Sequence, residues 1–420
     1  MEKHRFGKNN MIDTIKNNIQ MANQIIPYGK QHITEADINA VTETLISHYL
    51  TQGPKIKEFE DMFAKYVGSK YAIAVSNGTT ALHIAVLSLG LKKGDKIITT
   101  PITFAASANC ARYCDADVDF VDIDPRTYLI DIDKVKSLLS NSPKGTYKGI
   151  IPVQFAGRMA NMEELKALAN EYNLWIVEDA CHAPGAFFVD SKGVKQYAGN
   201  GKFADLSVFS FHPVKHIACG EGGMITTDNE ELYKELNRLR SHGITKGDDP
   251  YINDPSWACG LTEGSTNEFP GWYMEMQELG FNYRITDVQA ALGLSQLTRA
   301  DEGLEKRRLI AQKYAEAFKD KDYIFGQSGS IKGHAYHLYV VEFKDRIGLY
   351  NHLRTKNIFA QVHYIPVHLM PYYKKFGWKN GDMPVAEKYY QHCLSLPMYP
   401  TLTDEEQQFV IDTIDEYYTK

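Results

Sequence analysis

One lysine in this chain directly follows an apolar run and has apolar or small residues on both sides. Lys215 lies five residues after Ser210, in the segment SFHPVKHIACGEGG that continues from LSVFSF. Burial lowers the pKa of a lysine ammonium, and the neutral amine is the form that attacks a carbonyl carbon. Because a buried lysine without a function would be costly, we interpret Lys215 as a residue that forms a Schiff base.

A carboxylate closes a second apolar run, in the segment VEDACHAPGA. A buried Asp179 would need a cationic partner or strong hydrogen bonds, and a protonated pyridine nitrogen is one such partner. His182, three residues further along, could contact the same ring. Taken alone, the sequence fits a structural, hydrogen-bonded Asp179 equally well.

Two further segments offer a phosphate site and a ring platform. In SNGTT, Gly78 and Thr79 lie where a strand passes into a helix, and free N–H groups at a helix start bind anions, although ordinary N-capping explains the same residues. Phe104 follows another strand and either stacks on a flat ligand or belongs to the core. Combined with the lysine and the aspartate, these features are the contacts that pyridoxal 5′-phosphate (PLP) requires, and we predict it as the cofactor.

The elements that must position these residues form an alternating pattern. Short apolar runs alternate with helical patterns between about residues 70 and 230, which indicates a mostly parallel sheet covered on both faces. Ligands bind beyond the carboxyl ends of the strands in such sheets. A helical stretch over 286–318 is long enough to bridge two units, and the patterns at 337–343 and 359–364 predict strands of a smaller α+β unit. The apolar runs cover 71–75, 96–101, 118–123, 149–155, 174–179, 206–211 and 223–228.

Composition excludes several classes of protein. The 420 residues are 44% apolar and carry a formal net charge of −6, which argues for a folded chain that does not bind polyanions. The six cysteines are scattered without a CxxC pair, so we expect reduced thiols and no metal site. No run approaches about 20 apolar residues and the first 25 lack the apolar centre of a signal peptide, so we expect a soluble cytoplasmic protein.

Three segments together resemble a known family. VEDACHAPGA, SVFSFHPVKHIACGEGGMITTD and GFNYRITDVQAALGLSQL are similar to the sugar aminotransferases of the DegT/DnrJ/EryC1/StrS family, over about residues 26–420. The resemblance implies the α/β fold of PLP-dependent transferases of fold type I, which is aspartate-aminotransferase-like. It implies a large PLP-binding domain (26–285), and a bridging helix with a small C-terminal α+β domain (286–420). The first 25 residues (1–25) are an N-terminal extension in which the chain departs from the family.

The resemblance also implies roles for individual residues. Lys215 would be the Schiff-base lysine, Asp179 the partner of the pyridinium nitrogen and His182 a neighbour of the 3′-oxygen of the ring. Phe104 would stack on the ring. The phosphate would be held by Gly78, Thr79 and Ser210, and by Asn282 of a neighbouring subunit, which makes a homodimer part of the prediction. The nucleotide-sugar pocket would be lined by Tyr28, His48, Tyr49, Leu50, Thr51, Gln361, Val362, His363 and Tyr364.

Within the family, the segments IPYGKQ, HYLTQGP and AQVHYIPVH resemble most the enzymes of pseudaminic acid synthesis. The implied reaction (EC 2.6.1.92) moves an amino group, with L-glutamate as the expected donor, to C4 of a UDP-linked 4-keto-6-deoxy-N-acetylhexosamine. Transamination of another nucleotide-linked 3- or 4-keto sugar stays open.

Three other classes of protein are disfavoured. A PLP-dependent sugar dehydratase would carry histidine in place of Lys215, and a non-catalytic regulator on this scaffold would be expected to lack Lys215 or Asp179. A nicotinamide-dependent dehydrogenase would need a GxGxxG segment, which the chain lacks. The chain departs from the family at 217–219, where Ile-Ala-Cys replaces the common Thr-Thr-Gly, and we interpret Cys219 as a packing residue.

Overall fold

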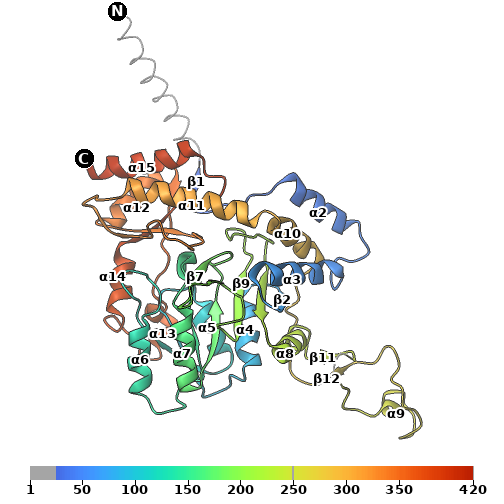
Figure 1. Ribbon diagram of the computed structural model, residues 1–420. Coiled ribbons are helices and arrows are strands. Elements are labelled where there is room, and N and C mark those ends of the chain that lie inside the picture. The colour runs from blue at the N-terminus through green and yellow to red at the C-terminus, as the bar shows by residue number, and fades with distance from the viewer. Residues whose placement is uncertain (1–24, 248–249, 420) are drawn as a thin grey trace, which may run out of the picture.

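A seven-stranded sheet forms the centre of the computed structural model, which describes residues 25–247 and 250–419 (Figure 1). The strand order is β2-β10-β9-β6-β5-β3-β4. β10 is antiparallel to both of its neighbours, and the other pairs are parallel, which confirms the predicted, mostly parallel sheet. The strands are β2 (Tyr71–Val75), β3 (Lys96–Thr99), β4 (Asp117–Phe120), β5 (Gly149–Ile151), β6 (Trp175–Asp179), β9 (Leu206–Ser210) and β10 (Gly223–Thr227).

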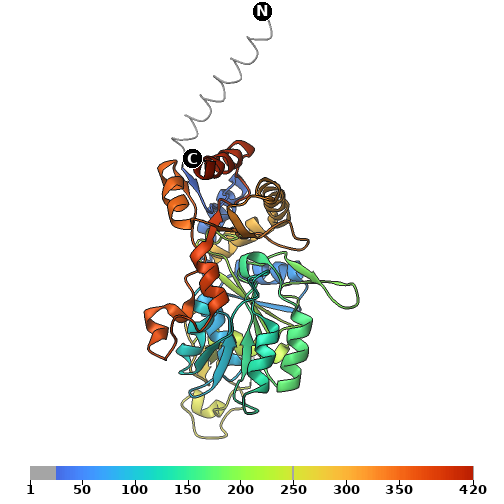
Figure 2. The ribbon, with the colours of Figure 1, turned by 90° about the vertical axis from the view of Figure 1, so that its left-hand side faces the viewer.

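Helices cover both faces of this sheet (Figures 1 and 2). Strand residues alternate between the two sides at the β2 edge, where Ile73 and Val75 belong to one buried cluster and Ala72 and Ala74 to another. The helices of this part are α2 (Glu35–Leu45), α3 (Pro54–Val67), α4 (Gly78–Ser88), α5 (Ala106–Tyr113), α6 (Ile132–Ser140), α7 (Met162–Tyr172) and α8 (Glu230–Arg240).

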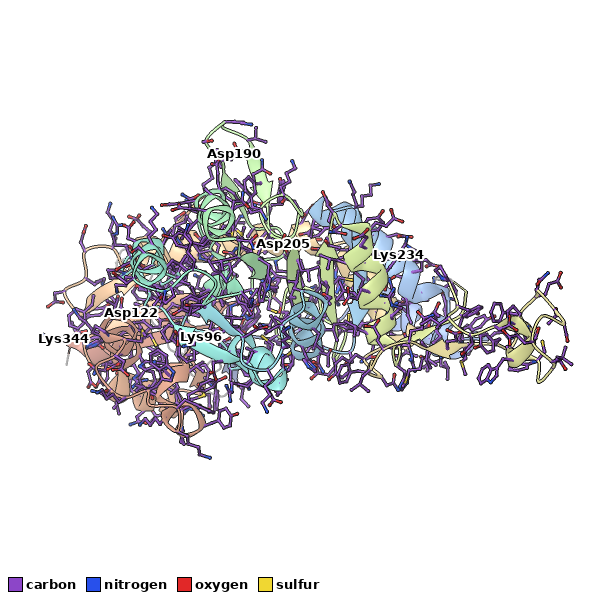
Figure 3. The ribbon with its side chains drawn as sticks, turned by 90° about the horizontal axis from the view of Figure 1, so that it is seen from below. Lys96, Asp122, Asp190, Asp205, Lys234 and Lys344 are labelled. Carbon is purple, nitrogen blue, oxygen red and sulfur yellow. The ribbon has the colours of Figure 1, made fainter. Side chains whose placement is uncertain are left out.

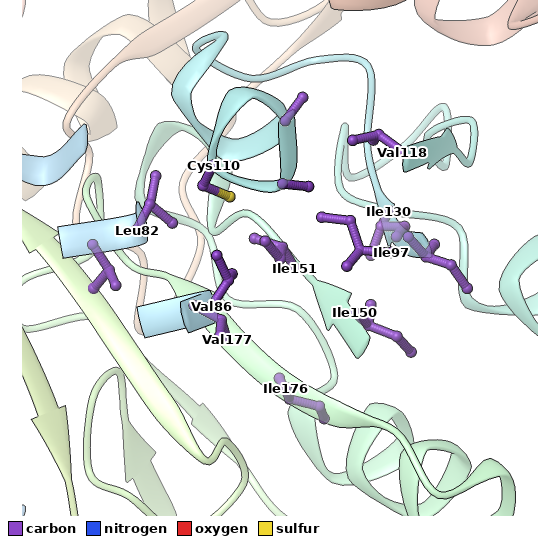
Figure 4. Packing of buried hydrophobic residues seen from close by; sticks show 14 of the residues in the cluster. Leu82, Val86, Ile97, Cys110, Val118, Ile130, Ile150, Ile151, Ile176 and Val177 are labelled. Atoms are coloured by element: carbon purple, nitrogen blue, oxygen red, sulfur yellow. The ribbon is translucent and has the colours of Figure 1, made fainter. Parts of the chain in front are cut away.

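Branched apolar side chains fill the centre of the sheet (Figure 4). Ile97, Ile150 and Ile176 come from three neighbouring strands, and Val86 of α4 packs in the same cluster. Each of these side chains is fully buried. A parallel sheet covered on both faces needs such near-continuous apolar strands, which is why these runs could be found in the sequence.

A second unit, with its own sheet and apolar cluster, follows along the chain. Its three-stranded antiparallel sheet has the order β13-β14-β16. Ile26 near the N-terminus packs into this cluster, because β1 (Ile26–Pro27) pairs in parallel with β15 (Ile358–Phe359). The remaining elements are β13 (Ile324–Gln327), β14 (Tyr339–Phe343), β16 (Cys393–Leu396), α12 (Arg346–Thr355), α13 (Pro371–Lys374), α14 (Pro384–His392) and α15 (Asp404–Thr419).

The helical stretch expected over 286–318 is two helices. α10 (Asp287–Leu297) and α11 (Ala300–Ala317) are separated at Thr298 and Arg299. The Thr298 hydroxyl donates to the Ser295 carbonyl at 2.6 Å, and Arg299 Nη2 donates to Asp37 Oδ2 at 2.6 Å. These side-chain bonds hold the chain at the break, and the apolar pattern alone could not show them.

The strand expected over 359–364 is also shorter than predicted. The strand β15 ends at Phe359, and Gln361 continues only as an isolated bridge to Ser395. Beyond it, Nδ1 of His363 lies 2.9 Å from Ser395 Oγ of β16, whereas the Tyr364 hydroxyl lies 3.2 Å from Nε2 of His182, which follows β6 of the central sheet. This departure from the strand brings both residues to the cavity described below.

An extended arm between α8 and α10 projects from the body of the molecule (Figures 1 and 3). It contains β11 (Ile244–Thr245), α9 (Pro255–Ala258) and β12 (Glu275–Met276). Three large apolar side chains on it are mostly exposed, Ile252 at 77%, Trp272 at 71% and Leu279 at 78%.

Several expectations concern the chain outside the central sheet. Residues 1–24 of the expected N-terminal extension lie outside the described residues. Of the helices that the structure describes, none has the length and apolar character needed to cross a bilayer. The six cysteines are free thiols, and Cys219 is buried in an apolar cluster with Phe59 and Phe211, as expected for a packing residue.

The contact between β10 and the start of α4 gives a test of the fold. A methyl group on Gly223 would lie 2.9 Å from the backbone nitrogen of Gly78 and closer still to the Asn77 carbonyl. Because that obstacle is backbone, we expect Gly223→Ala to lower the free energy of unfolding by about 1–3 kcal/mol, measured by urea denaturation. The control is Gly271→Ala, where a methyl group would meet open space; equal stabilities of the two variants would contradict the close approach.

Candidate active site

A cavity of about 510 Å³ lies at the carboxyl ends of the central strands. It has the position expected for a ligand site in a sheet of this kind. The predicted residues that line it are Tyr28, Gly78, Thr79, Phe104, Asp179, His182, Ser210, Lys215, His363 and Tyr364. Residues from distant parts of the chain thus meet at one site.

Lys215 reaches this cavity from the turn after β9. Its backbone N–H donates to the His212 carbonyl at 2.9 Å, and its Nζ lies 3.2 Å from Nε2 of His337. Burial lowers the pKa of the Lys215 ammonium to about 8; Arg307 acts in the same direction, whereas the nearby Asp179 opposes it. Among the residues that the structure describes, Lys215 forms no ion pair within 4 Å. The amine is therefore easily deprotonated near neutral pH.

His337, which contacts the lysine, was not predicted from the sequence. It lies just before β14, is 4% exposed, and its Nδ1 has no hydrogen-bond partner in the described structure. Burial, and next the Lys215 charge, hold the pKa of this imidazole well below its usual range. The segment HLYVVEF (337–343) had predicted only a strand. A histidine at the beginning of this apolar segment was the signal that could have indicated a site residue.

Asp179 ends β6 with its carboxylate at the cavity. Ser107 Oγ donates to Oδ2 at 2.6 Å, and the Cys181 backbone N–H donates to Oδ1 at 3.2 Å. The residue is 5% exposed. Ser107 lies three residues after Phe104 at the start of α5, so the same turn that presents the aromatic ring also fixes the carboxylate.

The neighbouring Glu178 has a different environment, since successive strand residues point to opposite faces. Its carboxylate accepts hydrogen bonds from Gln154 Nε2 at 2.8 Å, the Gly199 backbone N–H at 3.0 Å and Ser207 Oγ at 2.7 Å. Burial raises the pKa of Glu178. Three protein donors occupy this carboxylate, so Glu178 is structural, whereas Asp179 faces the cavity.

His182 is held between the backbone and an aromatic residue. Its Nδ1 accepts from the Ala156 backbone N–H at 3.2 Å, and its Nε2 lies 3.2 Å from the Tyr364 hydroxyl. Burial, and next the positive charge of Lys215, lower the pKa of His182 well below its usual range, so the ring is neutral. With Nδ1 an acceptor, Nε2 carries the proton.

The start of α4 supplies an anion site at the cavity. The Asn77 side chain accepts from the Thr80 backbone N–H at 2.9 Å, so the cap leaves the earlier N–H groups of Gly78 and Thr79 without an intrahelical partner. A methyl group on Gly78 would lie 3.1 Å from Ser210 Cβ, so glycine allows the start of α4 to lie close to the end of β9. These residues fit a phosphate group.

Other predicted residues do not line the cavity of the single chain. Asn282 is exposed and lies opposite Ser241 in an isolated bridge at the base of the arm. The segment 48–51 (His48, Tyr49, Leu50 and Thr51) is also exposed, as is Gln361, whereas Val362 is half-buried against two apolar clusters. Their roles stay predictions, and for Asn282 the prediction already requires a second subunit.

The sheet and the position of its cavity define the chain as a PLP-dependent transferase of fold type I. The chain belongs to the DegT/DnrJ/EryC1/StrS aminotransferase family, whose family model matches residues 31–415. The expected family and fold class are thereby confirmed.

Two relatives illustrate the range of the family. The spore coat polysaccharide biosynthesis protein SpsC of Bacillus subtilis is 37% identical over 405 residues, covering 94% of this chain and 98% of SpsC. The UDP-4-amino-4,6-dideoxy-N-acetyl-β-L-altrosamine transaminase of Campylobacter jejuni is 36% identical over 398 residues, covering 93% of this chain and 96% of the relative.

Solved structures agree with this assignment. Helicobacter pylori PseC, an aminotransferase involved in the biosynthesis of pseudaminic acid, superposes with a TM-score of 0.81 at 28% identity, covering 94% of this chain and 100% of PseC. Spr1654 of Streptococcus pneumoniae, described as a sugar aminotransferase, gives 0.81 in its PLP form and 0.82 in its PMP form, at 28% identity over 94% of this chain and 99% of that chain. The chain is therefore a sugar aminotransferase whose cofactor is PLP.

The environment of Lys215 predicts an unusual titration. After reductive ¹³C-methylation of the cofactor-free protein, we expect the NMR signal of Lys215 to titrate near pH 8, protonated below and neutral above, whereas ordinary lysines titrate near 10.4. The signal is assigned by its absence from Lys215→Ala. A Lys215 signal that titrates with the other lysines would contradict the burial of this amine.

Proposed function

We propose that this enzyme transfers an amino group from L-glutamate to C4 of a UDP-linked 4-keto-6-deoxy-N-acetylhexosamine in the cytoplasm, the amination step of pseudaminic acid synthesis. The observation that carries the proposal is the 36% identity to the Campylobacter jejuni transaminase over 93% of the chain. The similarity to Helicobacter pylori PseC over the whole of that chain supports it.

The described residues suit the placement of PLP in the cavity. Asp179, held by Ser107, would face the ring nitrogen, and Phe104, 63% exposed at the cavity, would lie against the ring. The phosphate would bind at Gly78, Thr79 and Ser210. When bound, PLP supplies an electron sink that stabilises negative charge at the carbon carrying the amino group.

Lys215 would carry the covalent attachment and the proton transfer. A neutral Nζ is a nucleophile, and burial makes that form more accessible by lowering the pKa to about 8. With PLP bound, the free Nζ would move a proton from the donor carbon to the cofactor in the first half-reaction, and from the cofactor to the sugar carbon in the second. His337, whose Nε2 lies 3.2 Å from Nζ in the structure, would position the free amine within the cavity.

The sugar would bind on the side of the cavity built by the C-terminal unit. The rings of Tyr28 and His363 lie 5.1 Å apart, and that of Tyr364 lies 6.4 Å from Phe104. These aromatic side chains offer flat apolar surfaces and polar tips to a sugar ring. SpsC, similarly related and named for a spore coat polysaccharide, favours another nucleotide-linked keto sugar as the second candidate substrate.

A substrate panel tests the proposal directly. The holoenzyme is incubated with L-glutamate and UDP- or dTDP-linked 3- and 4-keto sugars, and the products are identified by NMR. We expect amination at C4 of the UDP-linked 4-keto-6-deoxy-N-acetylhexosamine, with kcat/KM above that of the other sugars. Preferred amination at C3, or of a dTDP-sugar, would replace this substrate by the second candidate.

Two variants serve as controls for the roles of Lys215 and Asp179. Lys215→Ala is expected to lose turnover by at least about 10²–10⁴-fold, because the proton-transfer group is gone. Asp179→Asn removes a charged hydrogen bond to the ring and should lose about 10–100-fold. Both should retain the thermal unfolding of the parent to within a few degrees, and near-parent rates would remove these residues from the chemistry.

We also propose a homodimer with a shared active site. The exposed apolar side chains Ile252, Trp272 and Leu279 lie on the arm whose base carries Asn282. Contiguous exposed apolar side chains are typical of a protein–protein interface, and we expect these three to lie in one. Burial of the arm against a second copy would bring Asn282 near the partner's cavity, which is where the family resemblance places it.

Mixed dimers test the sharing of the site. Lys215→Ala and Asn282→Ala are each expected to reduce activity strongly, since each disables both sites of a homodimer. Unfolded and refolded together in equal amounts, they should recover about a quarter of parent activity, because half of the dimers then contain one intact site. If light scattering shows dimers but the mixture recovers no activity, Asn282 lies outside its partner's site.

A further inference from the structure

The turn that carries Lys215 lies against the segment 28–32, which we call the strap. Tyr28 of the strap lines the large cavity together with Val214. A methyl group on Gly29 would lie 3.4 Å from Val214 Cβ, so the strap and the turn lie side by side. The last three residues of the strap line a small hollow that Lys215 also lines. The strap therefore forms a wall of both spaces.

The strap is held at its two ends. At the first, the Met398 backbone N–H donates to the Tyr28 carbonyl at 2.9 Å. At the second, the His32 carbonyl accepts from Gln296 Nε2 at 3.0 Å and from Arg299 Nη2 at 2.6 Å. Within the described parts of the chain, the backbone of the three residues between these points makes no hydrogen bond. The course of the strap therefore depends on its two anchors.

The second anchor is part of a buried group of side chains at the junction of α10 and α11. Both donors also reach Asp37 Oδ2, Gln296 Nε2 at 3.0 Å and Arg299 Nη2 at 2.6 Å. The same oxygen accepts from the backbone N–H and the hydroxyl of Thr34, and Asp37 is fully buried. We call Asp37, Gln296 and Arg299 the clamp. Its geometry is well fixed, because an opened bond would leave a buried charge without its partner.

Tyr28 depends on the strap more than Lys215 does. The ring of Tyr28 lies 5.1 Å from that of His363, and its hydroxyl forms no hydrogen bond with any residue that the structure describes. The place of this ring therefore follows the backbone that carries it. The backbone N–H of Lys215, in contrast, donates to the His212 carbonyl within its own turn at 2.9 Å. A displaced strap would move Tyr28 and leave Lys215 where it is.

We propose that Asp37, Gln296 and Arg299 are positioning residues for the sugar substrate, because through the strap they hold Tyr28 at the sugar side of the large cavity. None of the three lines that cavity. The inference rests on the proposed function, which assigns this side of the cavity to the sugar. A weakened clamp should raise the KM of the sugar and leave the half-reaction with glutamate at Lys215 unchanged.

Two matched glutamine variants separate positioning from stability. Gln296→Met removes one donor of the clamp, and the control Gln407→Met removes a similarly buried donor that bonds the Ile310 carbonyl at 2.8 Å between α15 and α11. Both should lower the Tm of the holoenzyme to a similar extent. Only Gln296→Met should raise the KM of the UDP-linked 4-keto-6-deoxy-N-acetylhexosamine, by about 3–10-fold, as expected for one lost hydrogen bond.

In the same proteins, kcat and the rate at which L-glutamate alone bleaches the cofactor absorbance should match those of the parent. Equal KM values for the two variants, or a glutamate half-reaction slowed as much as the sugar half-reaction, would overturn the proposal. Arg299→Lys keeps the charge beside Asp37 but changes the geometry of its bonds. It should raise KM in the same way, and an unchanged KM in this variant would also contradict the clamp.

A double variant tests whether the clamp acts through Tyr28. Tyr28→Ala should itself raise the KM of the sugar, and Gln296→Met should then add no further increase, because effects that pass through one residue are not additive. KM increases that multiply in the double variant would overturn the proposal. A parent enzyme that aminates a different sugar of the panel would instead contradict the proposed function, and the same comparison is then made with that sugar.

Discussion

The rest of the site depends on one constraint, the burial of the Lys215 amine without a carboxylate beside it. An ion pair with Asp179 would keep the amine protonated and unable to attack a carbonyl. In the structure the nearest polar contact of Nζ is instead a neutral imidazole, His337, and the Asp179 carboxylate is bound by Ser107. Burial can then lower the pKa of the lysine, since its effect outweighs the opposing effects of Cys181 and Asp179.

The parallel sheet satisfies this constraint because successive side chains along a strand point to opposite faces of the sheet. Two adjacent carboxylates close β6, and the period of two sends Glu178 into a set of three protein donors and Asp179 into the cavity. The strand β9 ends beside β6 and carries the turn that delivers Lys215. A shift of β6 by one residue would exchange the two carboxylates, so the buried bonds of Glu178 also fix the register on which Asp179 depends.

The sequence allowed residues of the cavity to be predicted where these residues lie at or just after the end of a strand. The central strands could be predicted since buried parallel strands are continuous apolar runs. Asp179 and Ser210 lie at the ends of two such runs, and Lys215 lies in the turn after one of them. Ser107 and His337 could not be predicted in this way, because their importance lies in contacts with residues 72 and 122 positions away. The break at Arg299 depends on Asp37, again far away in sequence, and helical periodicity carries no signal for such a bond.

The residues proposed to hold the cofactor and those proposed to bind the sugar come from different parts of the chain. This separation bears on how substrates can vary within the family. The residues proposed to hold the cofactor come from the ends of strands in one rigid sheet, whereas Tyr28, His363 and Tyr364 come from segments attached to the C-terminal unit. Changes in those segments would reshape the proposed sugar pocket without moving Lys215 or Asp179. Specificity between sugars that differ in one hydroxyl rests on a few buried polar contacts, so relatives of equal similarity to this chain can act on different sugars with the same chemistry.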